Sequence, residues 1–336
     1  MFDHKILLRG CRVHMAAALL GIGLVGTQAS AAPQTAPAPA PKSVAITAIV
    51  EHPALDAIRD GVQDALKRAG YVAGKNLRLQ YQSAQGNTAT AGQIARKFIG
   101  DRPDVIVAIA TPSAQAVVAA TRDIPVVYSG VTDPVAAQLL KSLEPSGTNV
   151  TGVSDALALE KQIDLIKVIV PQAKRVGIVY NPGEANSAVV VKQLQALMSK
   201  SGLTLVEAAA PRSVDVASAA RSLIGKVDVF YSNTDNNVTS AYEALARVAN
   251  DARIPLIAGD TSAVQRGAAA ALGVNYRELG VQTGQIVVRI LKGEAPGSIA
   301  SQTGQKLELH LNPAAAQKQG ATLSDALIKS AAHVVK

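Results

Sequence analysis

Hydroxyl, amide and carboxylate side chains recur in five short clusters, and each cluster directly follows an apolar run rich in β-branched residues. The clusters are residues 111–113, 131–134, 181–183, 233–235 and 260–262. Continuous apolar runs of this kind are typical of parallel strands that are buried on both faces. The clusters then lie at the carboxyl ends of the strands, where open α/β sheets bind ligands. The sequence therefore predicts a binding site for a small polar ligand.

Thr111 and Ser113 belong to the cluster best suited to bind an anion. Pro112 between them fits the first turn of a helix, where its missing N–H group would have no partner. The free backbone N–H groups of such a turn, next to two hydroxyls, favour a carboxylate. The alternative is that Thr111 only caps its own helix and touches no ligand.

Asp133, Asp235 and Asp260 are the acidic residues of the clusters, and a carboxylate in a cleft is a natural partner for a ligand ammonium group. Aspartate at a junction between a strand and a helix also serves as a cap or turn former, which is the alternative for each of them. Asp235 and Asp260 are favoured as ligand contacts because polar neighbours add hydrogen-bonding groups beyond what one cap requires. These neighbours are Asn233, Asn236, Asn237 and Thr261.

Further candidates follow other predicted strands. Glu51 and His52 come after the first strand, and the polar stretch with Asn181, Asn186 and Ser187 comes after the strand at 175–180. No second histidine accompanies His52 in a predicted cleft loop, so a histidine pair for a metal is missing. We therefore interpret His52 as a ligand contact, with a purely structural role as the alternative.

Tyr128 ends another predicted strand, and Ser129 and Thr132 follow it. Aromatic rings with a polar tip suit the lining of a small-molecule pocket, especially one for an aromatic ligand. The alternative is a ring that covers the edge of the core. The chain has no Trp and only three Phe, so its seven Tyr are its main aromatic residues.

The elements that must position these residues are predicted to occur in the same order in two halves. The first half reads as strand 44–50, helix 54–69, strand 77–82, helix 88–99 and strand 104–110. The second half reads as strand 175–180, helix 185–200, strand 203–208, helix 214–224 and strand 227–232. This alternation predicts an α/β fold with two Rossmann-like lobes, each with a parallel sheet. Polar clusters from both lobes would then face a shared cleft.

The start of the chain carries an export signal. Lys5, Arg9 and Arg12 precede an apolar run at 15–26, and small residues at 29–31 suit cleavage. We expect a signal peptide at 1–31, a Pro/Ala-rich linker at 32–42 and a periplasmic mature protein. The only cysteine, Cys11, precedes the apolar run, so the mature protein would have no thiol for a disulfide, a nucleophile or a metal site.

Composition argues against several function classes. The formal net charge is +8, but the basic residues are scattered and the aromatic content is 3%, so we expect no binding to nucleic acid. The nucleophile motif GxSxG and the zinc motif HExxH are absent. We therefore expect neither an enzyme nor a bound metal or cofactor.

Several stretches resemble one family, the periplasmic substrate-binding proteins of ABC transporters with the type I fold, in the branch associated with tryptophan or tyrosine uptake. The resemblance covers about residues 44–321 and rests on EHPALDAIRDGVQDAL at 51–66, ATPSAQAV at 110–117, PVVYSGVTDPVAAQL at 125–139, NVTGVSD at 149–155, GIVYNPGEANS at 177–187 and the stretch 254–284. It implies two lobes joined by three hinge crossovers. We place the N-terminal lobe at 43–153 plus 275–298 and the C-terminal lobe at 154–274 plus 299–336.

The resemblance also implies a function. The protein would capture an amino acid, aromatic by preference, between its lobes and deliver it to a membrane permease. Thr111 and Ser113 match a carboxylate-side loop, and Asp260 would be the ammonium partner. We expect a monomer. An aliphatic ligand is the alternative to an aromatic one. The alternatives to transport are a ligand-sensing subunit that signals to a membrane receptor and a secreted enzyme.

Overall fold

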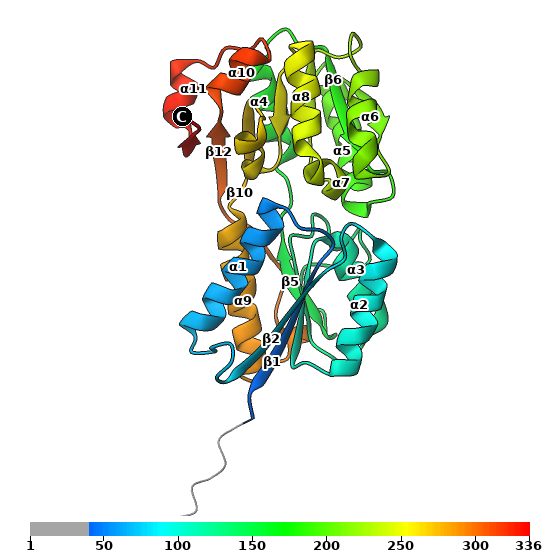
Figure 1. Cartoon of the computed structure of the whole chain (residues 1–336), viewed down its shortest axis with the longest axis vertical. Helices are drawn as coiled ribbons and strands as arrows, with labels where there is room; N and C mark the ends of the chain where they lie inside the picture. Colours follow the sequence, from blue (N-terminus) through cyan, green and yellow to red (C-terminus); the bar gives the residue numbers. More distant parts are fainter. Residues whose placement is uncertain (1–39) are drawn as a thin grey trace, which may run out of the picture. The chain divides into compact units, whose positions relative to one another are not determined.

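The computed structural model describes residues 40–336, and the expected signal peptide at 1–31 lies outside the described residues. Two α/β lobes follow one another in Figure 1, the first coloured mainly blue to cyan and the second mainly green to red. The first strand, β1 (Lys42–Ala48), begins at the last residue that we assigned to the linker at 32–42. The described residues contain no helix that is both long and apolar enough to cross a membrane.

The first lobe contains a six-stranded parallel sheet with the order β2-β1-β3-β4-β5-β11. After β1, its strands are β2 (Leu77–Ser83), β3 (Val105–Ile109), β4 (Val126–Ser129), β5 (Val150–Ser154) and β11 (Gln302–Thr303). Its helices are α1 (Pro53–Arg68), α2 (Thr88–Asp101), α3 (Thr111–Ala120) and α9 (Tyr276–Leu291), with the short 3₁₀ helix η3 (Pro296–Ser298). Helices α1 and α9 pack together on one face, and α2 and α3 on the other (Figure 1).

The second lobe contains a seven-stranded sheet with the order β7-β6-β8-β9-β10-β12-β13. Its strands are β6 (Arg175–Tyr180), β7 (Thr204–Ala209), β8 (Val229–Ser232), β9 (Leu256–Ala258), β10 (Ala270–Val274), β12 (Leu307–Leu311) and β13 (His333–Val334). Only β10 and β12 pair antiparallel in this sheet. Its helices are α4 (Leu159–Ile169), α5 (Ala185–Lys200), α6 (Val216–Ser222), α7 (Asn236–Ser240), α8 (Tyr242–Ala252), α10 (Pro313–Lys318) and α11 (Asp325–Ser330), with the 3₁₀ helices η1 (Ser213–Asp215) and η2 (Thr261–Arg266).

The predicted repeat is visible in the strand order. The order β2-β1-β3-β4-β5 of the first sheet corresponds to β7-β6-β8-β9-β10 of the second. An aspartate has the same role in both halves. Asp104, before β3, accepts from the backbone N–H of Ser43 in β1, at 2.7 Å, and Asp228, before β8, accepts from the N–H of Arg175 in β6, at 2.8 Å. The predicted fold class, two α/β lobes with mainly parallel sheets, is confirmed.

The chain passes between the lobes three times in the described residues: from β5 to α4, from β10 to α9 and from β11 to β12. The third passage comes later than our division at residue 299, because β11 pairs with β5 of the first sheet and holds the chain there through Thr303. The expected helix at 214–224 is also shorter. Its first residues form η1, and the helical hydrogen bonding of α6 ends at Ser222.

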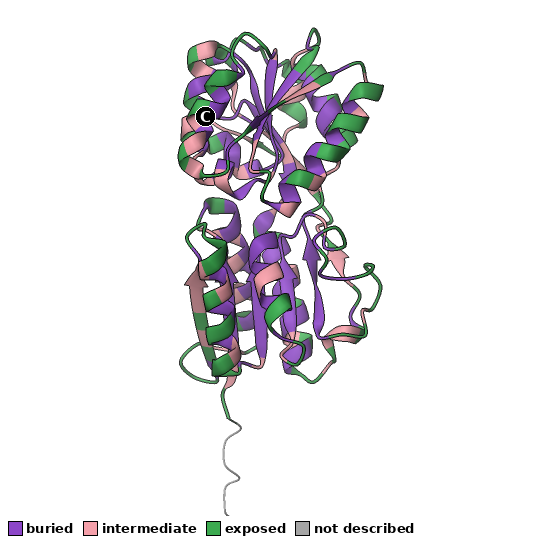
Figure 2. Ribbon diagram, turned by 90° about the vertical axis from the view of Figure 1, so that its right-hand side faces the viewer, coloured by how far each residue is buried: buried purple, intermediate pink, exposed green. Residues whose placement is uncertain are grey.

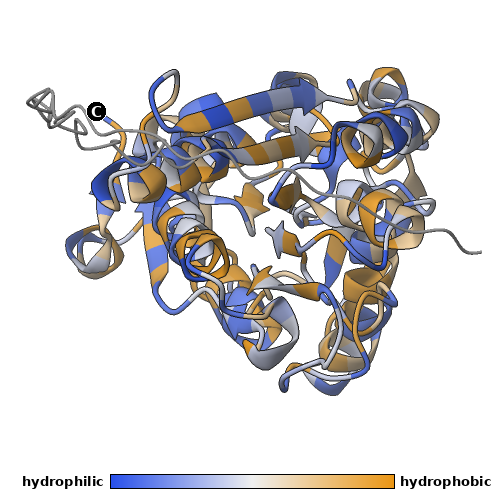
Figure 3. Ribbon diagram, turned by 90° about the horizontal axis from the view of Figure 1, so that it is seen from below, coloured by the Kyte–Doolittle hydropathy of each residue, from blue (hydrophilic) through white to orange (hydrophobic). Residues whose placement is uncertain are grey.

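Buried apolar residues fill the space between each sheet and its helices. Figure 2 shows the strands of both lobes largely buried, with exposed residues on the outer faces of the helices. Seen from below in Figure 3, hydrophobic residues lie toward the centre and hydrophilic ones on the outside. Helix α9 contributes Leu279, Ile286 and Val287 to the first lobe's core although it follows the second lobe in sequence.

Helices α1 and α9 are in backbone contact, which three glycines permit. A Cβ atom at Gly280 would lie 2.2 Å from the carbonyl oxygen of Ile58, and one at Gly61 would lie 2.3 Å from that of Arg277. A Cβ atom at Gly284 would meet Val62 and Ala65. Both helices begin at the edge of the sheet where the polar clusters lie, so this contact fixes the positions of their first residues.

We predict that Gly280→Ala destabilises the protein by about 1–3 kcal/mol, because the added methyl group collides with backbone atoms that cannot move independently. Gly92→Ala in α2 is the matched control: its Cβ atom meets only the end of Arg96, at 3.7 Å. The control should stabilise by about 0.5–1 kcal/mol, since alanine is the better helix former. Urea unfolding measures both, and equal effects would contradict the proposed packing.

Candidate functional site

The polar clusters of the two lobes meet in one cleft. Six of the predicted site residues line it: His52, Thr111 and Thr132 from the first lobe, and Asn186, Asn236 and Asp260 from the second. The Thr132 and Thr234 hydroxyls are 3.2 Å apart and join the lobes directly. The cavity between these side chains is small, about 20 Å³. It is too small to hold an amino acid in this arrangement of the lobes.

The N-terminus of α3 has the features of an anion site. Ala110, the preceding residue, has φ 70° and ψ 155°, an uncommon conformation for a residue other than glycine. The hydroxyl oxygens of Thr111 and Ser113 are buried and have no hydrogen-bond partner. The first N–H groups of a helix also lack partners within the helix. Four donor groups, the two hydroxyls and the backbone N–H groups of the same residues, are therefore available at this point.

Asp155 is the residue with the most unusual environment in the cleft. It follows β5 directly, is 3% exposed, and its Oδ1 atom has no hydrogen-bond partner. Burial raises the pKa of its carboxyl to about 6, against the lowering effect of hydrogen bonds from Thr132 and Tyr276. The Tyr276 hydroxyl donates to Oδ2 at 3.3 Å. The sequence pattern missed Asp155 as a site residue because it lies in a passage between lobes and not in a polar cluster after a strand.

Asp260 also lines the cleft, but part of its carboxylate is already used. It caps η2, where Oδ1 accepts from the backbone N–H of Ser262 at 2.8 Å. Burial raises the pKa of Asp260, and the hydrogen bonds with Ser262 oppose this shift. Asp155 and Asp260 are close enough that the charge of each raises the free energy of ionising the other.

His52 precedes α1 and is buried in the cleft. Burial, followed by the nearby positive charge of Arg266, lowers the pKa of His52 to about 3, so the ring is neutral at pH 7. Its Nδ1 atom has no hydrogen-bond partner, and the ring lines the cleft together with Asn236 of the other lobe. A neutral imidazole nitrogen without a hydrogen is an acceptor.

Behind the cleft in the second lobe lie two buried carboxylates, Glu184 and Asp235. Asp235 accepts from the backbone N–H of Asn181 at 2.6 Å and from the Ser187 hydroxyl at 2.5 Å, and it caps α7. Glu184 accepts from Asn186 and Asn236. Burial, together with the charge of Asp235, raises the pKa of Glu184 to about 7.

The other predicted site residues do not line the cleft. Tyr128 and Ser129 are buried in the core of the first lobe, and Ser129 contacts Thr283. Ser113 is also buried and is not among the cleft residues. Asp133 caps a turn, Thr261 donates to the Val274 carbonyl, and Asn233 donates to Ser187. Glu51 is exposed and accepts from Gln85, while Asn181, Ser187 and Asp235 form the hydrogen bonds described above. Thr234, Thr239 and Tyr276 line the cleft but were not predicted.

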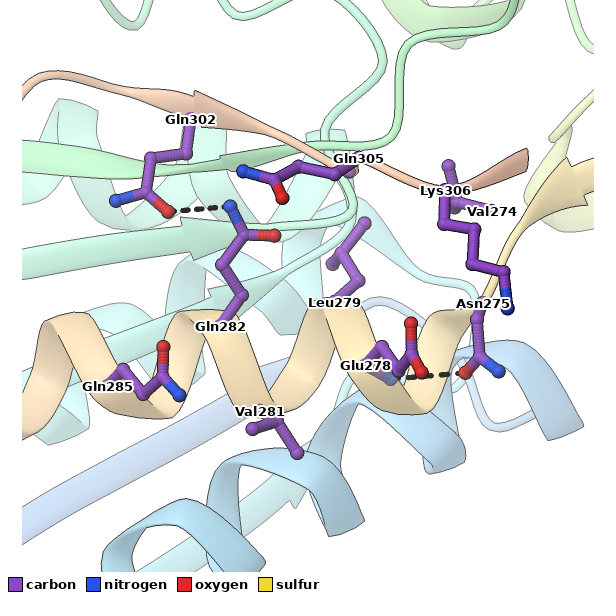
Figure 4. A pocket seen from close by; sticks show the side chains of 11 residues that line it. Val274, Asn275, Glu278, Leu279, Val281, Gln282, Gln285, Gln302, Gln305 and Lys306 are labelled. Atoms are coloured by element: carbon purple, nitrogen blue, oxygen red, sulfur yellow. Dashed lines mark hydrogen bonds between the residues drawn. The ribbon is translucent and has the colours of Figure 1, made fainter.

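A larger cavity lies outside the cleft, along α9 and the passage from β11 to β12. Figure 4 shows it lined by amide side chains, with Gln282 of α9 donating to Gln302 of β11 at 2.5 Å. It is open to solvent, and the side chains of Gln285, Gln305 and Lys306 on its walls are exposed. The residues brought together in the cleft have the buried, unpartnered polar atoms that this cavity lacks. Within residues 40–336, no three His, Cys, Asp or Glu side chains are arranged to hold a metal ion.

We predict that Asp155→Asn stabilises the ligand-free protein more at pH 8 than at pH 5. The pKa of about 6 in the folded protein lies above the ordinary value of 3.8 for an aspartate. The contribution of Asp155 to the free energy of unfolding is therefore greatest below pH 3.8. This contribution is lost as the pH rises through 6, and the loss is up to about 3 kcal/mol. Thermal unfolding of both proteins at the two pH values measures it. An equal gain at both would show that Asp155 ionises normally.

Comparison with known proteins agrees with this two-lobed architecture. A family model for ABC transporter substrate binding proteins matches residues 43–335. The chain is 41% identical over 271 residues to the tyrosine-binding protein of Clostridioides difficile (strain R20291), which covers 81% of this chain and 79% of the relative.

Two solved structures are informative about the lobes. One, from Streptococcus pneumonia, is an ABC domain in complex with L-Trp; it is 31% identical, has a TM-score of 0.85 and covers 88% of this chain and 100% of its own. The other is the ligand-free, open structure of a substrate binding protein with adhesive properties from Clostridium difficile. It is 40% identical, has a TM-score of 0.67 and covers 88% of this chain and 99% of its own. Of these two, the complex with L-Trp has the higher TM-score to this chain. The chain belongs to the family of ABC transporter substrate-binding proteins and has the type I fold.

Proposed function

We propose that this protein captures an amino acid, preferably an aromatic one, between its lobes and delivers it to a membrane permease for import. The observation that carries the proposal is the pairing of two opposite polar groups in one cleft. The N-terminus of α3 offers donors, including the unpartnered hydroxyl of Thr111, and Asp155 offers a buried acceptor. An amino acid has a carboxylate for the first and an ammonium group for the second.

The choice of an aromatic amino acid rests on the relatives. One is named a tyrosine-binding protein and another was solved with L-Trp. Their names describe binding, which supports a role in capture and not in catalysis. The predicted export signal agrees with capture outside the cytoplasm, and we propose a monomer that works there with a permease.

The position of Asp155 suggests how a ligand would close the lobes. This residue lies in the first passage between lobes, and its partner Tyr276 directly follows the second passage. A ligand ammonium at Asp155 would replace repulsion between carboxylates with attraction. The ligand would therefore stabilise the closed arrangement more than the open one, which is what shifts such an equilibrium.

We predict that the purified protein binds an L-amino acid in a one-to-one ratio, and that Asp155→Asn weakens this binding about tenfold or more. Loss of a hydrogen bond to a charged group costs about 1.5–3 kcal/mol. Asp260→Asn tests the partner favoured from the sequence, and Asp133→Asn is the control, since the Asp133 carboxylate is engaged with Val135 and Ala136. Isothermal titration calorimetry against all common amino acids is the measurement. A screen without any binding would refute the proposed function.

The affinity should also depend on pH. A bound ammonium group lowers the pKa of Asp155, so binding favours its deprotonated form. We therefore expect constant affinity between pH 7 and 8 and a loss of affinity as the pH falls below about 6, where the free carboxyl takes up a proton. Titrations between pH 5 and 8 check this. In Asp155→Asn the decline below pH 6 should disappear, and its persistence would assign it to another group.

A further inference from the structure

The orientation of one amide group in the cleft is fixed by its surroundings. The Asn186 Nδ2 atom donates to Glu184 Oε2 at 3.1 Å and to the Thr234 carbonyl at 3.0 Å. Both neighbours are acceptors, so the opposite orientation would place oxygen against oxygen. The Oδ1 atom must therefore point the other way. It is buried, has no partner and belongs to a residue that lines the cleft.

Glu184 shares in fixing this orientation with the Thr234 carbonyl, and it does so without lining the cleft. It is 6% exposed at the N-cap of α5. Its Oε2 atom accepts three hydrogen bonds, from Asn186 Nδ2, from the Asn236 backbone N–H at 3.2 Å and from Asn236 Nδ2 at 2.6 Å. One carboxylate oxygen therefore directs the amide nitrogens of two cleft asparagines away from the cleft.

With its nitrogen held by Glu184, Asn236 directs its amide oxygen away from Glu184. His52 of the other lobe lines the same cleft, and its Nδ1 atom has no hydrogen-bond partner. Asn186 and His52 thus bring unpartnered polar atoms to the cleft from opposite lobes.

We propose that Glu184 is a positioning residue that makes the cleft selective for amino acids whose side chain carries a hydrogen-bond donor. Asn186 Oδ1 would accept the phenol O–H of tyrosine or the indole N–H of tryptophan. This inference rests on the proposed function. The ligand carboxylate and ammonium are attached to one carbon and are met by Thr111 and Asp155, so the group that reaches Asn186 in the second lobe is the side chain.

The selectivity follows from the cost of an unpaired acceptor. Phenylalanine has the shape of tyrosine but no donor, and it would leave Asn186 Oδ1 buried without a partner. Sites built to bind a donor reject the analogue that lacks it much more strongly than hydrophobic pockets reject a missing methylene group. We expect at least tenfold weaker binding of phenylalanine than of tyrosine.

Calorimetric titration of the purified protein tests this with matched pairs of ligands. Tyrosine is compared with phenylalanine, and tryptophan with 3-(3-benzothienyl)-L-alanine, in which sulfur replaces the indole N–H. Asn186→Ala should reduce the preference within the better-bound pair to less than threefold, by weakening the donor ligand alone. Glu184→Ala should reduce the preference less, because the Thr234 carbonyl still accepts from Asn186 Nδ2. Glu184→Gln should retain the preference, because its carbonyl oxygen can accept the same three hydrogen bonds. Glu160→Ala, an exposed acidic residue on α4 of the same lobe, is the control.

The outcomes separate this inference from the proposed function. Equal affinity within both pairs for the unaltered protein, or a preference that survives in both alanine variants, would overturn the role of Asn186 and Glu184 while leaving amino-acid capture intact. If no amino acid binds, capture itself is wrong. Circular dichroism checks folding, and if Glu184→Ala does not fold, Asn186→Ala together with Glu184→Gln decides.

Discussion

The cost of burying carboxylates without a cation is the constraint on which the cleft depends. Asp155 and Asp260 are 3% and 4% exposed, and each raises the cost of ionising the other. Hydrogen bonds from Thr132, Tyr276 and Ser262 offset only part of this cost. The charge of Arg266 also offsets part of it at Asp260. Under the proposed function, a ligand ammonium group between the lobes would reduce the remaining cost and so favour closure around the ligand.

The rest of the molecule positions these groups. Parallel strands with the same order in both lobes bring their carboxyl ends to the cleft, and α1, α3, α5 and α9 begin there. Backbone contact between α1 and α9, through Gly61, Gly280 and Gly284, holds the start of α1 next to Tyr276. Since His52 precedes α1 and Tyr276 begins α9, a packing detail in the core determines where two cleft residues lie.

Sequence reasoning worked best where the signal is local. The strand at 175–180 and the helix at 185–200 have the predicted bounds, because hydrophobic periodicity and nearby Gly and Pro mark them clearly. Helix α9 begins at Tyr276, where the Asn275 side chain caps it by accepting from the backbone N–H of Glu278. At 214–224 the apolar pattern continues beyond the helix, since a buried Leu223 can pack against the sheet from a turn as well as from a helix.

By itself the sequence determined the fold class, the repeated halves, the family and the polar clusters at the ends of the strands, because all of these depend on residues that are close along the chain. It could not separate Thr111, which lines the cleft, from Asp133, which caps a turn, since both follow strands in the same way. Only the tertiary structure placed Asp155 in the cleft, left its Oδ1 atom without a partner and fixed the Asn186 amide against Glu184 and Thr234. The reason is physical: desolvation and unpaired hydrogen-bonding groups depend on which segments from both lobes surround a side chain, and those segments are far apart in the sequence.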